Sequence, residues 1–162
     1  MNCANCGSPL AVVEGREYLQ CPCCRSLHFP EPLKFSADRI VPLGHPATIG
    51  CPHGHGQLML GTLDGRRVLF CETCRGILTP NHDFAWLVQL RRGAHRGPDD
   101  PPRPLDPEHL KQQVPCPACE AAMEVHPYYG PGNVVIDSCR KCKLVWLDSG
   151  ELARIERAPG RR

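Results

Sequence analysis

The sequence has few aromatic residues, no long apolar segment and little net charge. Only four Phe, two Trp and three Tyr occur among 162 residues, so a large aromatic core is not available. No run approaches the roughly 18 apolar residues that a membrane-spanning helix requires. The first residues, MNCANCGS, contain no apolar stretch of the kind found in a secretory signal. We therefore expect a cytoplasmic protein that is stabilised by something other than a large hydrophobic core.

Cysteine, by contrast, is abundant, with twelve residues that fall almost entirely into paired Cys-x-x-Cys turns, here called knuckles. A knuckle directs two thiolates at one point, and two knuckles supply the four sulfur ligands that zinc favours. Disulfides are the alternative, but a reducing compartment keeps thiols free. We expect about three Zn²⁺ per chain, each contributing on the order of 10 kcal/mol to a small domain.

The predicted zinc ligands form three sets along the chain. They are Cys3, Cys6, Cys21 and Cys24; then Cys51, His55, Cys71 and Cys74; and finally Cys116, Cys119, Cys139 and Cys142. For the first set iron is an alternative metal, because sulfur tetrahedra accept both. Cys23 is the one cysteine left over, either a small buried residue or a redox-sensing thiol.

The middle set is ambiguous, because Gly54 stands where a knuckle would place its second cysteine. His53 and His55 are the candidates for the missing ligand. His55 is favoured because the apolar residue Met59 lies four positions after it, and an apolar residue follows the knuckle cysteine Cys119 at the same spacing. A middle site without metal is a further alternative.

These sets predict a small metal-stabilised α+β fold of three tandem zinc ribbons, which are β-hairpins with zinc knuckles, with short helices after ribbons two and three. The expected divisions are zinc ribbon one at 1–30, a proline-rich connector at 31–50, ribbon two plus helix at 51–96, a proline-rich linker at 97–107, ribbon three plus helix at 108–157, and a basic tail at 158–162. Five prolines in the linker predict an extended segment, and hence two mechanical parts joined there.

Local signals refine this outline. The expected strands cover residues 10–13, 17–20, 58–60, 68–70, 123–125 and 134–137, with one more over 35–41 in the connector. Asp64-Gly65 predicts a hairpin turn. Thr79 and Pro80 predict an N-cap and first residue for a helix that ends near Gly93. Asp148 and Glu151 form an acidic variant of the capping box before a second helix.

The third unit resembles a known family. CPACEAAMEV followed by VVIDSCRKCKLVWLDSGELARI is similar to the bacterial zinc-ribbon family named after the zinc finger of transcription factor IIB, whose members carry CPxC, ID-x-C-x-x-C-x-x-x-W and LDxGEL motifs. The resemblance covers about 40 residues and implies a zinc ribbon within a cytoplasmic bacterial binding module. Lys143 departs from the family pattern, which more often has Gly. Unit two looks like a diverged copy, and unit one is a generic ribbon.

The partner is less constrained than the fold. Deprotonated ligand thiols and three zinc ions change the formal charge from +2 to about −3, which weakens the case for nucleic acid. Trp146 could be a base-stacking platform, but a core position is favoured. The basic residues Arg66, Arg67, Arg91, Arg92, Arg140, Lys141 and Lys143 are interspersed with acids and predict a mixed surface.

No nucleophile–base arrangement is evident, and a catalytic zinc would need an open coordination position. We therefore expect a non-enzymatic protein with structural zinc sites that binds another macromolecule, with protein favoured over nucleic acid. The alternatives are a transcription-related nucleic-acid-binding protein and a redox- or metal-responsive regulator. No membrane and no small-molecule substrate are expected among the partners.

Overall fold

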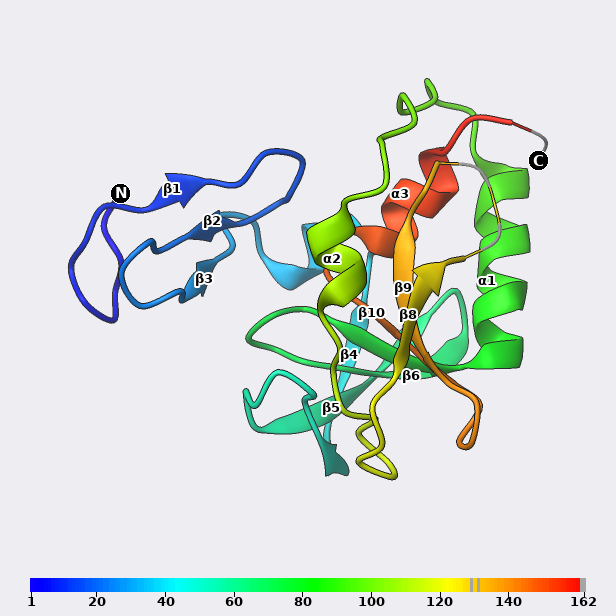
Figure 1. Cartoon of the computed structure of the whole chain (residues 1–162), viewed down its shortest axis with the longest axis horizontal. Helices are drawn as coiled ribbons and strands as arrows, with labels where there is room; N and C mark the ends of the chain where they lie inside the picture. The colour runs from blue at the N-terminus through cyan, green and yellow to red at the C-terminus, as the bar shows by residue number, and fades with distance from the viewer. Residues whose placement is uncertain (129, 131, 161–162) are drawn as a thin grey trace.

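The computed structural model describes residues 1–128, 130 and 132–160, whose strands form two antiparallel sheets accompanied by short helices (Figure 1). The predicted α+β class is confirmed. Residues 129 and 131, which lie between the strands expected at 123–125 and 134–137, are outside the described residues, as are residues 161–162 of the expected basic tail. No helix within the described ranges has the length and apolar character needed to cross a membrane.

The smaller sheet belongs to ribbon one and contains β1 (Ala11–Val12), β2 (Leu19–Gln20) and β3 (Leu27–His28) in that order. The first two strands were predicted but are shorter than expected, and β3 was not predicted. In Figure 1 this ribbon extends to one side of the rest of the molecule. Arg75 of ribbon two connects the two parts, because its guanidinium lies 4.1 Å from the centre of the Phe29 ring and donates to the Glu31 carbonyl at 2.6 Å.

The larger sheet has seven strands and joins ribbons two and three. Its order is β4 (Val41–Gly50), β5 (Gln57–Leu63), β6 (Arg66–Phe70), β7 (Ile77–Pro80), β10 (Leu144–Leu147), β9 (Val135–Cys139) and β8 (Glu124–Pro127). β7 of ribbon two pairs with β10 of ribbon three, from Ile77 opposite Leu147 to Pro80 opposite Leu144. The expectation of two mechanical parts joined at 97–107 is therefore wrong, since backbone hydrogen bonds join them directly. The residue boundaries of the units stay a prediction.

The connector differs from its predicted form. A 3₁₀ turn, η1 (Leu33–Phe35), replaces the start of the strand expected over 35–41, and β4 begins only at Val41. Pro42 and Pro46 lie within β4, which is possible because β4 is an edge strand and register shifts interrupt its pairing with β5.

The described part of the chain also contains three α-helices: α1 (Asn81–Ala94), α2 (Pro107–Lys111) and α3 (Glu151–Arg157). The predicted end of α1 near Gly93 is confirmed, but Thr79 is not its N-cap, because Thr79 lies in β7 and Pro80 occupies the cap position. α2 was not predicted; it begins at a proline, and the Asp106 side chain accepts a hydrogen bond from the Glu108 N–H.

Two apolar clusters cover different parts of the large sheet. In the first, Phe70, Ile77 and Leu147 pack with side chains of α1 and α3 such as Leu87 and Ile155. The second surrounds the cysteines of ribbons two and three and contains the fully buried Trp146. The metal-ligand sets of these two ribbons therefore share one core, and the first set stands apart in ribbon one.

Candidate metal centres

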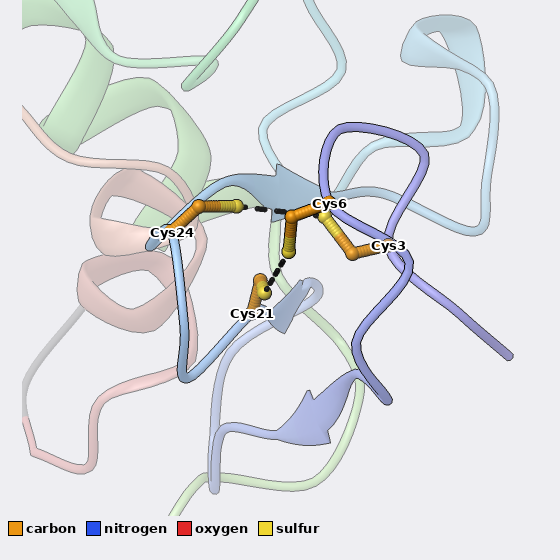
Figure 2. Close-up of side chains that lie close together, drawn as sticks. All are labelled: Cys3, Cys6, Cys21 and Cys24. Atoms are coloured by element: carbon orange, nitrogen blue, oxygen red, sulfur yellow. Dashed lines mark hydrogen bonds between the residues drawn. The ribbon is translucent and has the colours of Figure 1, made fainter.

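The structure brings the side chains of each predicted ligand set together. In all three sets the ligand atoms lie within 4.8 Å of one another. Figure 2 shows the first set, where Cys6 Sγ lies 3.4 Å from Cys21 Sγ and Cys3 Sγ lies 3.6 Å from Cys24 Sγ. The distance is 3.8 Å between Cys51 and Cys74, and 3.7 Å between Cys119 and Cys139.

These distances fit zinc. Four sulfurs at Zn–S bonds of about 2.3 Å in a tetrahedron lie about 3.8 Å apart. Two sets offer four thiols and one offers three thiols and a histidine nitrogen, which are donor sets typical of structural zinc. The clusters are therefore consistent with about three zinc ions per chain. Such ions would supply the cross-links that ribbons with small cores need.

One backbone pattern builds four of the knuckles. The N–H of the first cysteine donates to the carbonyl of the residue five positions ahead, as from Cys3 to Ser8 at 2.8 Å. The N–H of the residue after the second cysteine donates to the carbonyl of the first cysteine, as from Gly7 to Cys3 at 2.8 Å. The same pair of bonds occurs at Cys21, Cys71 and Cys116. The residue after the second cysteine has a positive φ: Gly7, Arg25, Arg75 and Glu120, with Lys143 alike after the last knuckle. Lys143 thus adopts the left-handed conformation for which glycine is better suited.

The middle set departs from this pattern at Gly54. The bond from Cys51 N–H to the Gly56 carbonyl is kept at 2.8 Å, but Gly54, with φ of 78°, now donates to the Cys51 carbonyl. The turn closes one residue early, so the next side chain that reaches the sulfurs is that of His55. Its Nδ1 lies 3.7 Å from Cys51 Sγ and 3.9 Å from Cys71 Sγ.

His53 has a different partner. Its Nε2 lies 3.0 Å from Asp148 Oδ1, in the loop before α3. The hydrogen bond with Asp148 raises the pKa of His53, although burial opposes this. Asp148 Oδ1 also accepts a hydrogen bond from Trp146 Nε1 at 3.0 Å. His53 therefore connects ribbon two to ribbon three and does not join the ligand cluster.

Metal binding requires ionised thiols, and in each ligand set the pKa of at least one thiol is lowered. Hydrogen bonds between the thiols and burial raise the pKa of others, namely Cys21, Cys51, Cys74, Cys116 and Cys142. The Ser26 hydroxyl, 2.6 Å from Cys24 Sγ, is the main reason that the pKa of Cys24 falls to about 5. The backbone N–H of Cys142 lowers the pKa of Cys139 to about 7. Hydrogen bonds with Cys51 and Cys74 lower the pKa of Cys71.

The favoured core position of Trp146 is confirmed, and the candidate nucleic-acid features do not form a binding surface. Trp146 is fully buried, and its ring packs directly on Gly76, so no stacking face is available. Arg91 and Arg92 are also buried: Arg91 binds Asp64 at 2.6 Å, and Arg92 donates to the carbonyls of Ile155 and Ala158. Arg140 is exposed but pairs with Glu124 at 2.8 Å. The predicted basic residues therefore do not form a continuous track.

Two features lie outside the three sets. Cys23 is exposed, so its reading as a small buried residue is wrong. Within the described residues His109, Asp148 and Glu151 form one more cluster of possible ligand atoms. Sequence reasoning missed this cluster because His109 lies far from the other two in the chain and no spacing motif connects them.

Comparison with known proteins identifies the third ribbon only. Residues 115–158 match the family model described as transcription factor zinc-finger, the zinc ribbon of transcription factor IIB. This confirms the resemblance of unit three. No curated protein and no solved structure matches the chain.

Proposed function

We propose that this chain is a cytoplasmic protein-binding module in which zinc ions hold the ribbons together and the large sheet carries the docking surface. The match of residues 115–158 to a zinc-ribbon family supports the structural role of the metal. We further propose that the chain is not an enzyme, because each ligand set already offers four protein donors. The observation that carries the partner type is an apolar groove on the sheet.

The groove follows from strand register. Leu60 pairs with Leu69, and Leu69 pairs with Leu78, so these side chains lie on one face. Pro80 pairs with Leu144 and extends the same face onto β10. Together with Ile49, Arg67 and Val68 they line a groove of about 230 Å³.

The chemistry of this groove suits apolar side chains of a partner protein. Its walls are aliphatic, with Arg67 as the one charged lining residue. The opposite face of the same strands, which carries Phe70 and Ile77, is buried under the helices. An accessible aliphatic groove on an otherwise covered sheet is typical of a protein interaction site.

A transcription-related nucleic-acid-binding role is the second candidate, and the family match of residues 115–158 favours it. Against it stand the buried Trp146, the buried Arg91 and Arg92, and a loaded charge of about −3. Random duplex or single-stranded DNA should bind with a dissociation constant weaker than about 10 µM at physiological salt.

The test is site-specific photo-crosslinking in native cells from Leu69, in the groove, compared with Gln57, an exposed residue of the neighbouring strand. We expect discrete protein adducts from Leu69 that disappear when Leu60→Glu is added, with zinc content unchanged. Submicromolar binding to nucleic acid in fluorescence anisotropy, lost when Arg140, Lys141 and Lys143 are replaced by Ala, would instead establish the second candidate.

A further inference from the structure

Three side chains outside the zinc-ligand sets meet at the start of α3. His109 comes from α2, and Asp148 and Glu151 come from the loop and first residue of α3. One ligand atom of each lies within 4.8 Å of the others. One imidazole and two carboxylates are a donor set that first-row divalent cations bind.

The feature that points to a bound cation is the buried carboxylate of Glu151. The residue is 1% exposed, and its Oε2 accepts a hydrogen bond from the Asp148 N–H at 2.9 Å. Its Oε1 is buried and has no hydrogen-bond partner among the described residues. The nearest candidate, His109 Nε2, lies 4.0 Å away, which is too far for a hydrogen bond. A buried carboxylate oxygen without a partner is costly unless it is protonated or faces a cation.

Neighbouring cationic side chains do not supply the hydrogen bond that Glu151 Oε1 lacks. Arg16 lies close enough to affect Glu151, but its guanidinium donates to the Ser149 carbonyl at 3.1 Å. Among the described residues, the hydrogen bonds of the Asp148 carboxylate with His53 and Trp146 both involve Oδ1. Asp137 is also buried, and its Oδ1 is a second carboxylate oxygen that has no hydrogen-bond partner in the described part of the chain. Arg154 also lies close enough to interact with Glu151, yet Glu151 Oε1 and Asp137 Oδ1 keep no hydrogen-bond partner among the described residues.

We propose that His109, Asp148 and Glu151 form a fourth metal site, distinct from the three cysteine-rich sets, that binds Zn²⁺ or a similar first-row divalent cation. The ligand atoms would be His109 Nε2, Glu151 Oε1 and an oxygen of Asp148, with water completing the coordination. The nitrogen and oxygen lie 4.0 Å apart, and tetrahedral bonds of about 2.0–2.2 Å place two ligands about 3.3–3.6 Å apart, so the two side chains would move together by about 0.5 Å on binding.

The electrostatics agree with this assignment. Burial lowers the pKa of His109, so its imidazole is neutral at pH 7 and has a free lone pair. Burial raises the pKa of Glu151, and Asp148 adds to this effect, so a cation would be bound in competition with a proton. Three donors without thiolate should bind more weakly than the cysteine sets, and this site should exchange its metal readily.

The structural consequence concerns the linker. α2 lies where the 97–107 linker enters ribbon three, and a metal shared with α3 would fix it in place. The cleavage of this segment by trypsin at Lys111, which is exposed, should then depend on metal occupancy.

The test starts from zinc-loaded protein dialysed against a weak chelator, to which Zn²⁺ is returned in a calorimetric titration. We expect one further equivalent to bind, and slower cleavage at Lys111 when it does. Glu151→Gln keeps an acceptor for the Asp148 N–H, and it should abolish this equivalent, as should His109→Ala. Titration with Co²⁺ should fill the site without adding thiolate charge-transfer absorption, and Mg²⁺ should not bind.

The matched controls are Glu108→Gln, on the exposed side of α2, and His82→Ala, an exposed histidine of α1. Both should bind the fourth equivalent as the unmodified protein does. The proposal is overturned if the unmodified protein takes up no further Zn²⁺, or if His109→Ala and Glu151→Gln take it up unchanged. It does not depend on the protein-binding role proposed above.

Discussion

His53 and Asp148 are joined across the boundary between ribbons two and three, with His53 Nε2 3.0 Å from Asp148 Oδ1. The same carboxylate oxygen accepts a hydrogen bond from the buried Trp146. This contact gives the two neighbouring histidines different functions: His53 fastens the ribbons together, while His55 faces the cysteines of the middle set.

Replacing His55 and replacing His53 should therefore have different effects on zinc content and on stability. His55→Ala should lower the zinc content by about one equivalent, because the middle set loses its fourth donor. His53→Ala should leave the zinc content unchanged and lower the free energy of unfolding by about 1 kcal/mol, since the lost hydrogen bond is partly exposed. Elemental analysis with chemical unfolding distinguishes them, and the reverse pattern would assign the ligand to His53.

Gly76 should not tolerate a side chain. A Cβ at this position would overlap the buried ring of Trp146. Gly76→Ala should lower the free energy of unfolding by about 2–3 kcal/mol and alter Trp fluorescence. Gly93→Ala is the control, because a Cβ in that part of α1 meets nothing and should be neutral or slightly stabilising. Equal stability of the two variants would mean that Trp146 does not pack on Gly76.

Asp38 should make stability depend on pH. It is buried and caps the start of α3, accepting hydrogen bonds from the N–H groups of Gly150 at 2.7 Å and Ala153 at 3.0 Å. Burial raises its pKa from 3.8 to about 6; Glu17 adds to the increase, and Arg91 and the two N–H groups oppose it.

Because this pKa is higher in the folded chain than in the unfolded chain, the folded protein holds the proton more tightly. The resulting stabilisation is full below the unfolded pKa and is lost as pH rises through about 6. Relative to Asp38→Asn, the unmodified protein should lose about 1 kcal/mol between pH 5 and pH 7, measured by urea unfolding with zinc in excess. The comparison with Asp38→Asn cancels the protonation of ligand thiols. A constant difference would show that Asp38 does not titrate in this window.

Limited proteolysis should nick the linker without separating its two sides. Arg96 is exposed and should be cut first, because Arg103 precedes a proline. Since β7 and β10 are paired, the fragments should elute together in native size-exclusion chromatography and separate only in denaturant. Fragments that separate under native conditions would restore the picture of two independent parts.

The metal-ligand sets could be predicted from sequence because knuckle geometry is local. The left-handed residue after each second cysteine and its two backbone hydrogen bonds depend on a few neighbouring residues. The hairpin at Asp64-Gly65 was predictable for the same reason, and both residues have positive φ. The preference for His55 rested on spacing alone, and the structure adds the reason, which is the early turn at Gly54.

The joining of ribbons two and three could not be predicted in this way. The pairing of Leu78 with Trp146 connects distant residues, and no local signal encodes it. The prolines of the connector and the linker led to a prediction of little regular structure there. An edge strand nevertheless tolerates Pro42 and Pro46, and Pro107 begins a helix. The cluster of His109 with Glu151 depends on this long-range packing too.

The central claim is that three tightly bound zinc ions hold the ribbons, and metal analysis combined with X-ray absorption at the zinc edge tests it most directly. Protein purified without added metal and treated with a weak chelator should retain three zinc ions per chain. Together these three ions should be bound by eleven sulfurs and one nitrogen. A single zinc per chain, a predominance of iron, or a nitrogen- and oxygen-rich coordination shell would contradict it.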